Sequence, residues 1–161
     1  MESSGFLVSP REGDQMWVVD ELIRFVARGH ETGGAYTLTE SYVLPDGGPP
    51  THIHRREDEA FWVLEGNLQV TVGDHTSVVP AGGFIHLPRG VPHRFHNDSQ
   101  FPVRFLTLLV PAGLEGFFES VGVPGSMGDA PPGETPEHIA RIHELAPRYG
   151  IELMFDDAPG E

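Results

Sequence analysis

The 161-residue chain contains no cysteine. This absence excludes disulfide bridges, iron–sulfur clusters, thiolate zinc sites and a cysteine nucleophile. Any metal ion must therefore be held by His, Asp or Glu side chains. The sequence also lacks an apolar run long enough to cross a membrane, and residues 1–5 lack the basic and apolar regions of a signal peptide. We therefore expect a cytoplasmic protein that has no membrane partner.

Basic residues are scarce in this chain. Ten Lys and Arg side chains stand against 24 Asp and Glu, which gives a formal net charge of −14. Such a chain repels phosphate backbones, so we expect no nucleic-acid partner. The sequence also lacks a Ser-His-Asp order, a Gly-rich phosphate loop and a dinucleotide fingerprint.

Twenty Gly and fifteen Pro residues divide the chain into short segments. Between residues 35 and 110, strand-like runs alternate with turn residues, as at Gly66-Asn67 and Gly73-Asp74. Short strands at this regular spacing predict an all-β sandwich or barrel, and the length predicts one domain. Residues 16–19 and 22–27 predict two earlier strands, and residues 6–8 predict a third. In the strand at residues 35–44, alternate side chains from Tyr36 to Tyr42 should share one face.

The pattern changes after Pro111. Leu114, Phe117, Phe118 and Val121 follow the spacing of an amphipathic helix. A second helix should begin at Pro136, with Thr135 as its N-cap, and should stop by Gly150. The end of the chain, residues 156–161, is expected to fray.

Two histidines lie two residues apart in a segment that reads as extended. His52 and His54 should point the same way, while Ile53 points the other way. A carboxylate, Glu59, follows five residues after His54. Two imidazoles and a carboxylate on one wall make an open site for a first-row transition metal. His93 is the candidate for a fourth ligand, and Glu57 and Asp58 are rival carboxylates.

Two blocks of the sequence carry a family resemblance. The first runs His52-x-His54, four residues, Glu59, six residues, Gly66. The second runs Gly82, five residues, Pro88-x-Gly90, two residues, His93, three residues, Asn97. Together they resemble the two motifs of the cupin family. Gly47, the leading glycine of the first motif, stands one residue closer to His52 than is usual, which alters only the loop.

The resemblance implies a cupin-type double-stranded β-helix, or jelly-roll barrel, with a short C-terminal helical extension. The barrel should span residues 35–112, with N-terminal strands in 1–34 packed on it and the extension in 113–161. The implied ligands are His52, His54, Glu59 and His93, since the distance to Gly66 favours Glu59 over its neighbours. They would hold one divalent ion, which is Fe, Mn, Ni, Co, Cu or Zn in different cupins. Cupins are commonly dimers, so we expect a homodimer, which the apolar strands of residues 17–27 could form across subunits.

Within cupins, the chain is similar to the small quercetin 2,3-dioxygenase-like group, through residues 61–66 and 109–118. This likeness implies an oxidoreductase of dioxygenase type that acts on a small aromatic or enolisable substrate, with Glu59 as a catalytic base. Two alternatives stay open: a redox-neutral isomerase, epimerase or lyase, and a non-catalytic cupin that binds a small ligand. The expected substrate pocket contains Phe61, Val63, Phe95, Phe105, Phe117 and Phe118.

Overall fold

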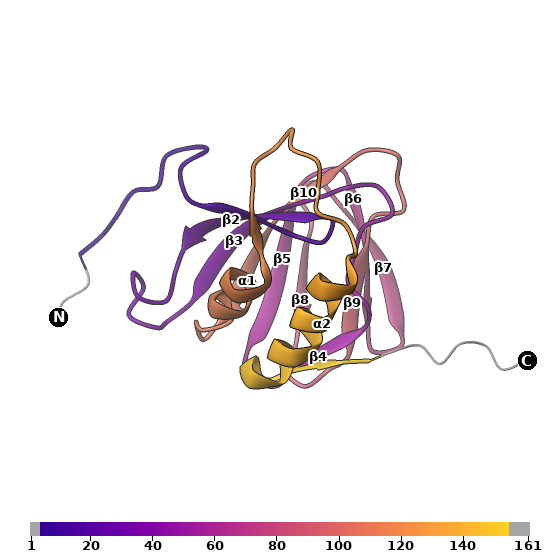
Figure 1. Cartoon of the computed structure of the whole chain (residues 1–161). Helices are drawn as coiled ribbons and strands as arrows, with labels where there is room; N and C mark the ends of the chain where they lie inside the picture. Colours follow the sequence, from indigo (N-terminus) through magenta and orange to yellow (C-terminus); the bar gives the residue numbers. More distant parts are fainter. Residues whose placement is uncertain (1–3, 155–161) are drawn as a thin grey trace, which may run out of the picture.

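Two antiparallel sheets form the body of the protein (Figure 1). The structure is a computed structural model, and it describes residues 4–154. One sheet has the order β11-β1-β2-β3-β10-β5-β8, and the other has the order β12-β4-β9-β6-β7. The strands of the first sheet are β1 (Gln15–Val18), β2 (Glu21–Ala27), β3 (Thr37–Val43), β5 (Asp58–Glu65), β8 (Phe84–Leu87), β10 (Val103–Val110) and β11 (Val123–Pro124). Those of the second are β4 (His52–His54), β6 (Asn67–Val72), β7 (His75–Pro80), β9 (His93–His96) and β12 (Ile151–Leu153). The all-β fold predicted from the sequence is confirmed.

The core lies between the two sheets and follows from alternation along the strands. On β3, Thr37, Thr39, Ser41 and Val43 are buried, while the residues between them are partly exposed. The face expected for Tyr36 to Tyr42 is therefore the outer face. Phe61, Phe95 and Phe105 meet inside the barrel, with ring centroids 5.0 to 5.6 Å apart. Edge-to-face packing of this kind stabilises a core beyond simple burial.

The two helices lie together on one side of the barrel (Figure 1). They are α1 (Glu115–Val121) and α2 (Pro136–Leu145), and a 3₁₀ turn, Ala146–Tyr149, follows α2. The Thr135 hydroxyl accepts a hydrogen bond from the His138 backbone N–H at 3.1 Å, which confirms it as the N-cap. Gly150 ends the segment with a φ of 72°, a left-handed conformation that glycine adopts at little cost.

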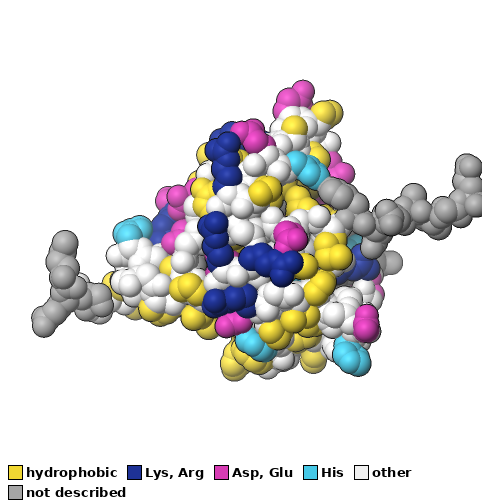
Figure 2. Space-filling model, turned by 90° about the horizontal axis from the view of Figure 1, so that it is seen from below, with side chains coloured by type: hydrophobic (Ala, Val, Ile, Leu, Met, Phe, Trp, Pro, Cys, Tyr) yellow, Lys and Arg dark blue, Asp and Glu magenta, His cyan; other side chains and the backbone are white. Residues whose placement is uncertain are grey.

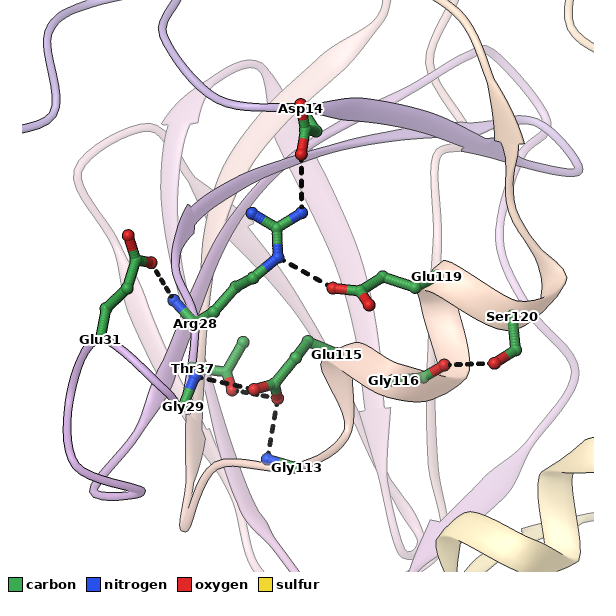
Figure 3. A network of polar contacts seen from close by, with 10 residues as sticks. All are labelled: Asp14, Arg28, Gly29, Glu31, Thr37, Gly113, Glu115, Gly116, Glu119 and Ser120. Carbon is green, nitrogen blue, oxygen red and sulfur yellow. Dashed lines mark hydrogen bonds and ion pairs between the residues drawn. The ribbon is translucent and has the colours of Figure 1, made fainter.

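A polar network fastens α1 to the N-terminal strands (Figure 3). The Glu115 carboxylate accepts hydrogen bonds from the backbone N–H of Gly29 at 2.7 Å, the Thr37 hydroxyl at 2.5 Å and the backbone N–H of Gly113 at 2.8 Å. Beside it, Arg28 pairs with Asp14 and with Glu119 on α1. The position of α1 over the barrel is therefore set by a carboxylate at its first residue.

The structure differs from the sequence-based expectations in three segments. Residues 6–8 form no strand, because they pair with none of the strands; Phe6 and Leu7 are exposed, and Val8 is partly buried. The C-terminal extension contains two short strands as well as helices: β11 pairs with β1, and β12 pairs with β4. The strands of residues 17–27 are paired within the chain, with β11, β3 and each other, so the homodimer stays a prediction. Residues 156–161, where fraying was expected, lie outside the described residues.

The surface is not uniformly acidic. Viewed from below, Arg side chains gather near the middle of the face, among hydrophobic and uncharged groups and beside a few acidic ones (Figure 2). Several Arg side chains of the chain are paired with carboxylates, such as Arg55 with Glu152 and Arg89 with Asp58. Among residues 4–154, no helix is long and apolar enough to span a bilayer.

Candidate metal centre

Three strands bring His52, His54, Glu59 and His93 together inside the barrel. The two sheets meet here: His52 and His54 come from β4, Glu59 from β5, and His93 from β9 directly opposite His52. All four side chains are buried, and one potential ligand atom of each lies within 4.8 Å of the others. The sequence motif therefore predicted a set of side chains that the fold does assemble.

Backbone carbonyls fix the orientation of two of the imidazoles. His52 Nδ1 lies 2.9 Å from the Pro50 carbonyl oxygen, and His93 Nδ1 lies 3.0 Å from that of Val91. A carbonyl oxygen can only accept, so each Nδ1 carries the proton and each Nε2 keeps its lone pair. Metal-binding histidines are commonly held by such a bond from the other ring nitrogen.

The Glu59 carboxylate closes the cluster. Its Oε2 atom lies 3.3 Å from His54 Nε2 and 2.9 Å from His93 Nε2. Glu59 Oε2 and His93 Nε2 are nevertheless buried without a hydrogen-bond partner. Leaving such atoms unpaired is costly, and a shared cation would satisfy them. Three imidazoles and one carboxylate, without thiolate, suit a divalent first-row transition ion.

The pKa values of the cluster follow from burial and mutual charge. Burial and the neighbouring His54 and His93 lower the pKa of His52 to about 3. Burial alone would lower the pKa of His54, but the Glu59 and Glu57 carboxylates raise it. Burial alone would raise the pKa of Glu59, but the His54 and His93 imidazoles hold it below its ordinary value. At neutral pH, His52 is thus neutral and Glu59 ionised, the forms in which each binds a metal.

A second carboxylate, Glu57, lies beside the cluster. It is buried, and its Oε2 atom is 4.0 Å from His54 Nδ1, with neither atom in a hydrogen bond. Burial raises the pKa of Glu57, while His54 and Arg56 oppose that change. Sequence reasoning treated Glu57 only as a rival of Glu59. The spacing of three residues from His54 was the only sign of this contact in the sequence.

A cavity of about 170 Å³ opens onto the cluster. His52, His54 and Glu59 border it from the barrel, and Phe117 and Phe118 border it from α1. The rest of the wall combines aliphatic side chains, such as Ile139 and Ile142 from α2 and Ile151 and Leu153 from β12, with polar ones, among them Asp20, Glu134 and His143. The helical extension thus forms one wall of the space in front of the metal ligands.

The expected pocket residues divide into two groups. Phe61, Phe95, Phe117 and Phe118 border the cavity. Val63 and Phe105 do not; both are fully buried in the hydrophobic core. They share a strand face with cavity residues but lie deeper between the sheets.

Sequence reasoning also missed residues that border the cavity. Glu21 at the start of β2, Thr39 and Ser41 on β3, and Thr107 on β10 all do so. The signal was an alternation of hydroxyl side chains along β3, on the face opposite to that of Tyr42.

Known proteins resemble this chain in sequence and in fold. A family model described as "Cupin domain" matches residues 40–109. Quercetin 2,3-dioxygenase of Bacillus subtilis (strain 168) is 28% identical over 119 residues, which are 74% of this chain and 35% of that protein. The chain therefore spans about a third of the length of this relative.

Two solved structures extend the likeness. The polyketide cyclase RemF from Streptomyces resistomycificus is 29% identical, with a TM-score of 0.52, over 62% of this chain and 69% of that one. KdgF from Halomonas sp. is 16% identical and resembles this chain in fold, with a TM-score of 0.63 over 70% of this chain and 99% of that one. With the two sheets, both motifs and the buried His₃Glu cluster in place, these matches show that the chain belongs to the cupin superfamily.

Proposed function

We propose that the protein is a metal-dependent oxidoreductase of dioxygenase type that acts on a small aromatic or enolisable substrate. The observation that carries the proposal is the buried His₃Glu cluster at the end of a largely apolar cavity. The similarity to quercetin 2,3-dioxygenase supports the reaction class. His52, His54, Glu59 and His93 would hold the ion, which would supply Lewis-acid or redox chemistry toward substrate oxygen.

The protein's own groups would bind and orient the substrate. Phe61 and Phe95 on the barrel and Phe117 on α1 offer aromatic surface to a planar ring. The ionised Glu59 carboxylate would accept the proton of a substrate hydroxyl, which is the base role expected of it. The apolar wall would keep bulk water from the reacting atoms.

Oxygen uptake tests this proposal. Protein is purified, loaded in turn with Fe(II), Mn(II), Ni(II), Co(II), Cu(II) or Zn(II), and mixed with the flavonol quercetin. We expect O2 consumption with at least one ion. The His52→Ala variant should lose both the bound metal and the O2 consumption. His75→Ala is the matched control, because His75 is exposed on β7 and lies outside the cluster. The proposal fails if no loaded form consumes O2, or if His52→Ala consumes it at the rate of the natural protein.

A redox-neutral reaction is the second candidate. The 29% identity to a polyketide cyclase favours it, because that name describes ring closure rather than oxygen insertion. The same cluster would then polarise a carbonyl group. Substrate turnover that continues at an unchanged rate without O2 would support this candidate, and tight binding without any product would support a ligand-binding protein.

A further inference from the structure

A row of hydroxyl groups runs along one wall of the cavity. Thr39, Ser41 and Thr107 are at most 5% exposed, yet all three border the cavity. Thr39 on β3 stands directly opposite Thr107 on β10. Hydroxyl groups that face a cavity each have one proton to donate and two lone pairs, so they can hydrogen-bond a ligand as well as their protein neighbours. Their place beside the cavity suits a ligand that carries polar atoms.

A carboxyl group stands at one end of this row. The Ser41 hydroxyl donates a hydrogen bond to Glu21 Oε1 at 2.6 Å, and Glu21 also borders the cavity. Burial, reinforced by the like charges of Asp20 and Glu59, raises the pKa of Glu21 to about 7, although the bond from Ser41 opposes that change. Near neutral pH the carboxyl group can therefore either donate or accept a hydrogen bond.

The strand register separates this polar end from the metal ligands. On β10, Phe105 lies opposite Ser41, and Leu109 lies opposite Glu59. Along the backbone of β10 the two levels are four residues apart, a rise of roughly 13 Å at about 3.3 Å per residue. Thr107 lies between them, opposite Phe61 on its other side. This wall of the cavity thus has polar groups at both ends, and between them the Thr39 and Thr107 hydroxyls lie beside the aromatic ring of Phe61.

We infer that Glu21 and Ser41 form a second substrate-binding site, which hydrogen-bonds an oxygen function of the substrate remote from the one at the metal ligands. The substrate class that fits is a polyhydroxylated aromatic compound with oxygen atoms at both ends of its ring system. A compound with a single enol group would leave Glu21 and Ser41 without their ligand. This inference rests on the proposed function for the metal end and adds a specificity determinant to it.

Anaerobic binding of two flavonols tests the inference separately from oxygen chemistry. Quercetin carries hydroxyls on all of its rings, whereas 3-hydroxyflavone keeps only the enol group. Dissociation constants are measured by fluorescence titration of the metal-loaded protein without O2. We expect the natural protein to prefer quercetin by about tenfold or more, the equivalent of one well-placed hydrogen bond.

Three variants assign that preference to the two residues. Glu21→Leu and Ser41→Ala should each lower it several-fold, while 3-hydroxyflavone affinity and metal content stay unchanged. Glu21→Gln, which can still donate and accept, should keep part of it. Unchanged 3-hydroxyflavone binding shows that the cavity is intact, and Ser41→Ala provides the test if Glu21→Leu does not fold.

Three results overturn the inference. One is a natural protein that does not distinguish the two flavonols, including one that binds neither. Another is a preference for quercetin that survives in both Glu21→Leu and Ser41→Ala. The third is an equal loss of affinity for both compounds, because that indicates a general disturbance of the cavity. A protein that discriminates as expected but consumes no O2 would refute the dioxygenase proposal alone.

Discussion

The Glu21 carboxyl group should make the protein less stable as the pH rises from about 5 to 8. Its pKa is about 7 in the folded chain, against an ordinary value of 4.5. Between these values the folded state holds a proton that the unfolded state has released, so the free energy of unfolding falls with increasing pH. At 1.36 kcal/mol per pH unit, a difference of about 2.5 units corresponds to about 3 kcal/mol at pH 8.

The substitution Glu21→Gln removes this penalty and keeps the shape of the side chain. The amide oxygen of the substituted side chain can still accept the bond from Ser41. We therefore expect the variant to be more stable than the natural protein by up to about 3 kcal/mol at pH 8, and by less than about 1 kcal/mol at pH 5. Urea unfolding at pH 5, 6, 7 and 8 in the presence of EDTA measures the difference. Asp74→Asn, at an exposed turn between β6 and β7, is the control for the pH dependence of the rest of the chain.

A bound metal ion should reduce the difference in stability between Glu21→Gln and the natural protein. The negative charge of Glu59 contributes to the raised pKa of Glu21, and a dication at Glu59 would offset that charge. The stability difference at pH 8 should therefore be smaller in metal-loaded protein than in EDTA. A stability difference that is constant from pH 5 to 8, or a Glu21→Gln variant that is less stable at pH 8, would show that the Glu21 carboxyl group is not desolvated in the folded protein.

Other regions of the molecule give three further predictions. Deleting residues 151–161 removes β12 from the edge of β4, so we expect the metal content to fall, as measured by elemental analysis. Deleting only residues 155–161 is the control. Equal metal content in the two variants would refute this prediction. Glu115→Gln should cost about 2 kcal/mol in urea unfolding, because three donors lose a charged acceptor, whereas Glu119→Gln should cost less than about 1 kcal/mol at its half-exposed pair with Arg28. The homodimer predicts a mass twice that of the chain in light scattering, and a monomer mass would exclude it.

The sequence predicted the side chains of the metal centre better than it predicted the cavity in front of them. Spacing alone placed His52 and His54 on one strand face, and the family motifs added Glu59 and His93. These four residues lie close to strand ends, where short-range patterns and turns determine position. The hydrogen bonds from the Nδ1 atoms of His52 and His93 to backbone carbonyls were not predictable in this way, because they depend on how the preceding loops fold.

The alternation of side chains along a strand did not predict how deep each residue lies inside the barrel. Glu59, Phe61 and Val63 occupy one face of β5, as predicted, but only the first two border the cavity. Alternation predicts which side chains point into the barrel. It does not predict which of these contact the opposite sheet and which border the cavity. The same limit explains why Phe105 was placed in the pocket and lies in the core.

The polar wall of the cavity illustrates why a barrel's specificity is harder to predict than its metal ligands. Glu21 and Ser41 are 20 residues apart and meet because β2 pairs with β3, in a register that places Ser41 opposite Ile23. Register depends on the whole sheet, so a short motif cannot encode it. The four ligands follow a pattern shared with other cupins, whereas Glu21 and Ser41 lie outside both motifs. In proteins that share these four metal ligands, substitutions on the strands equivalent to β2 and β3 can therefore change the substrate without disturbing metal binding.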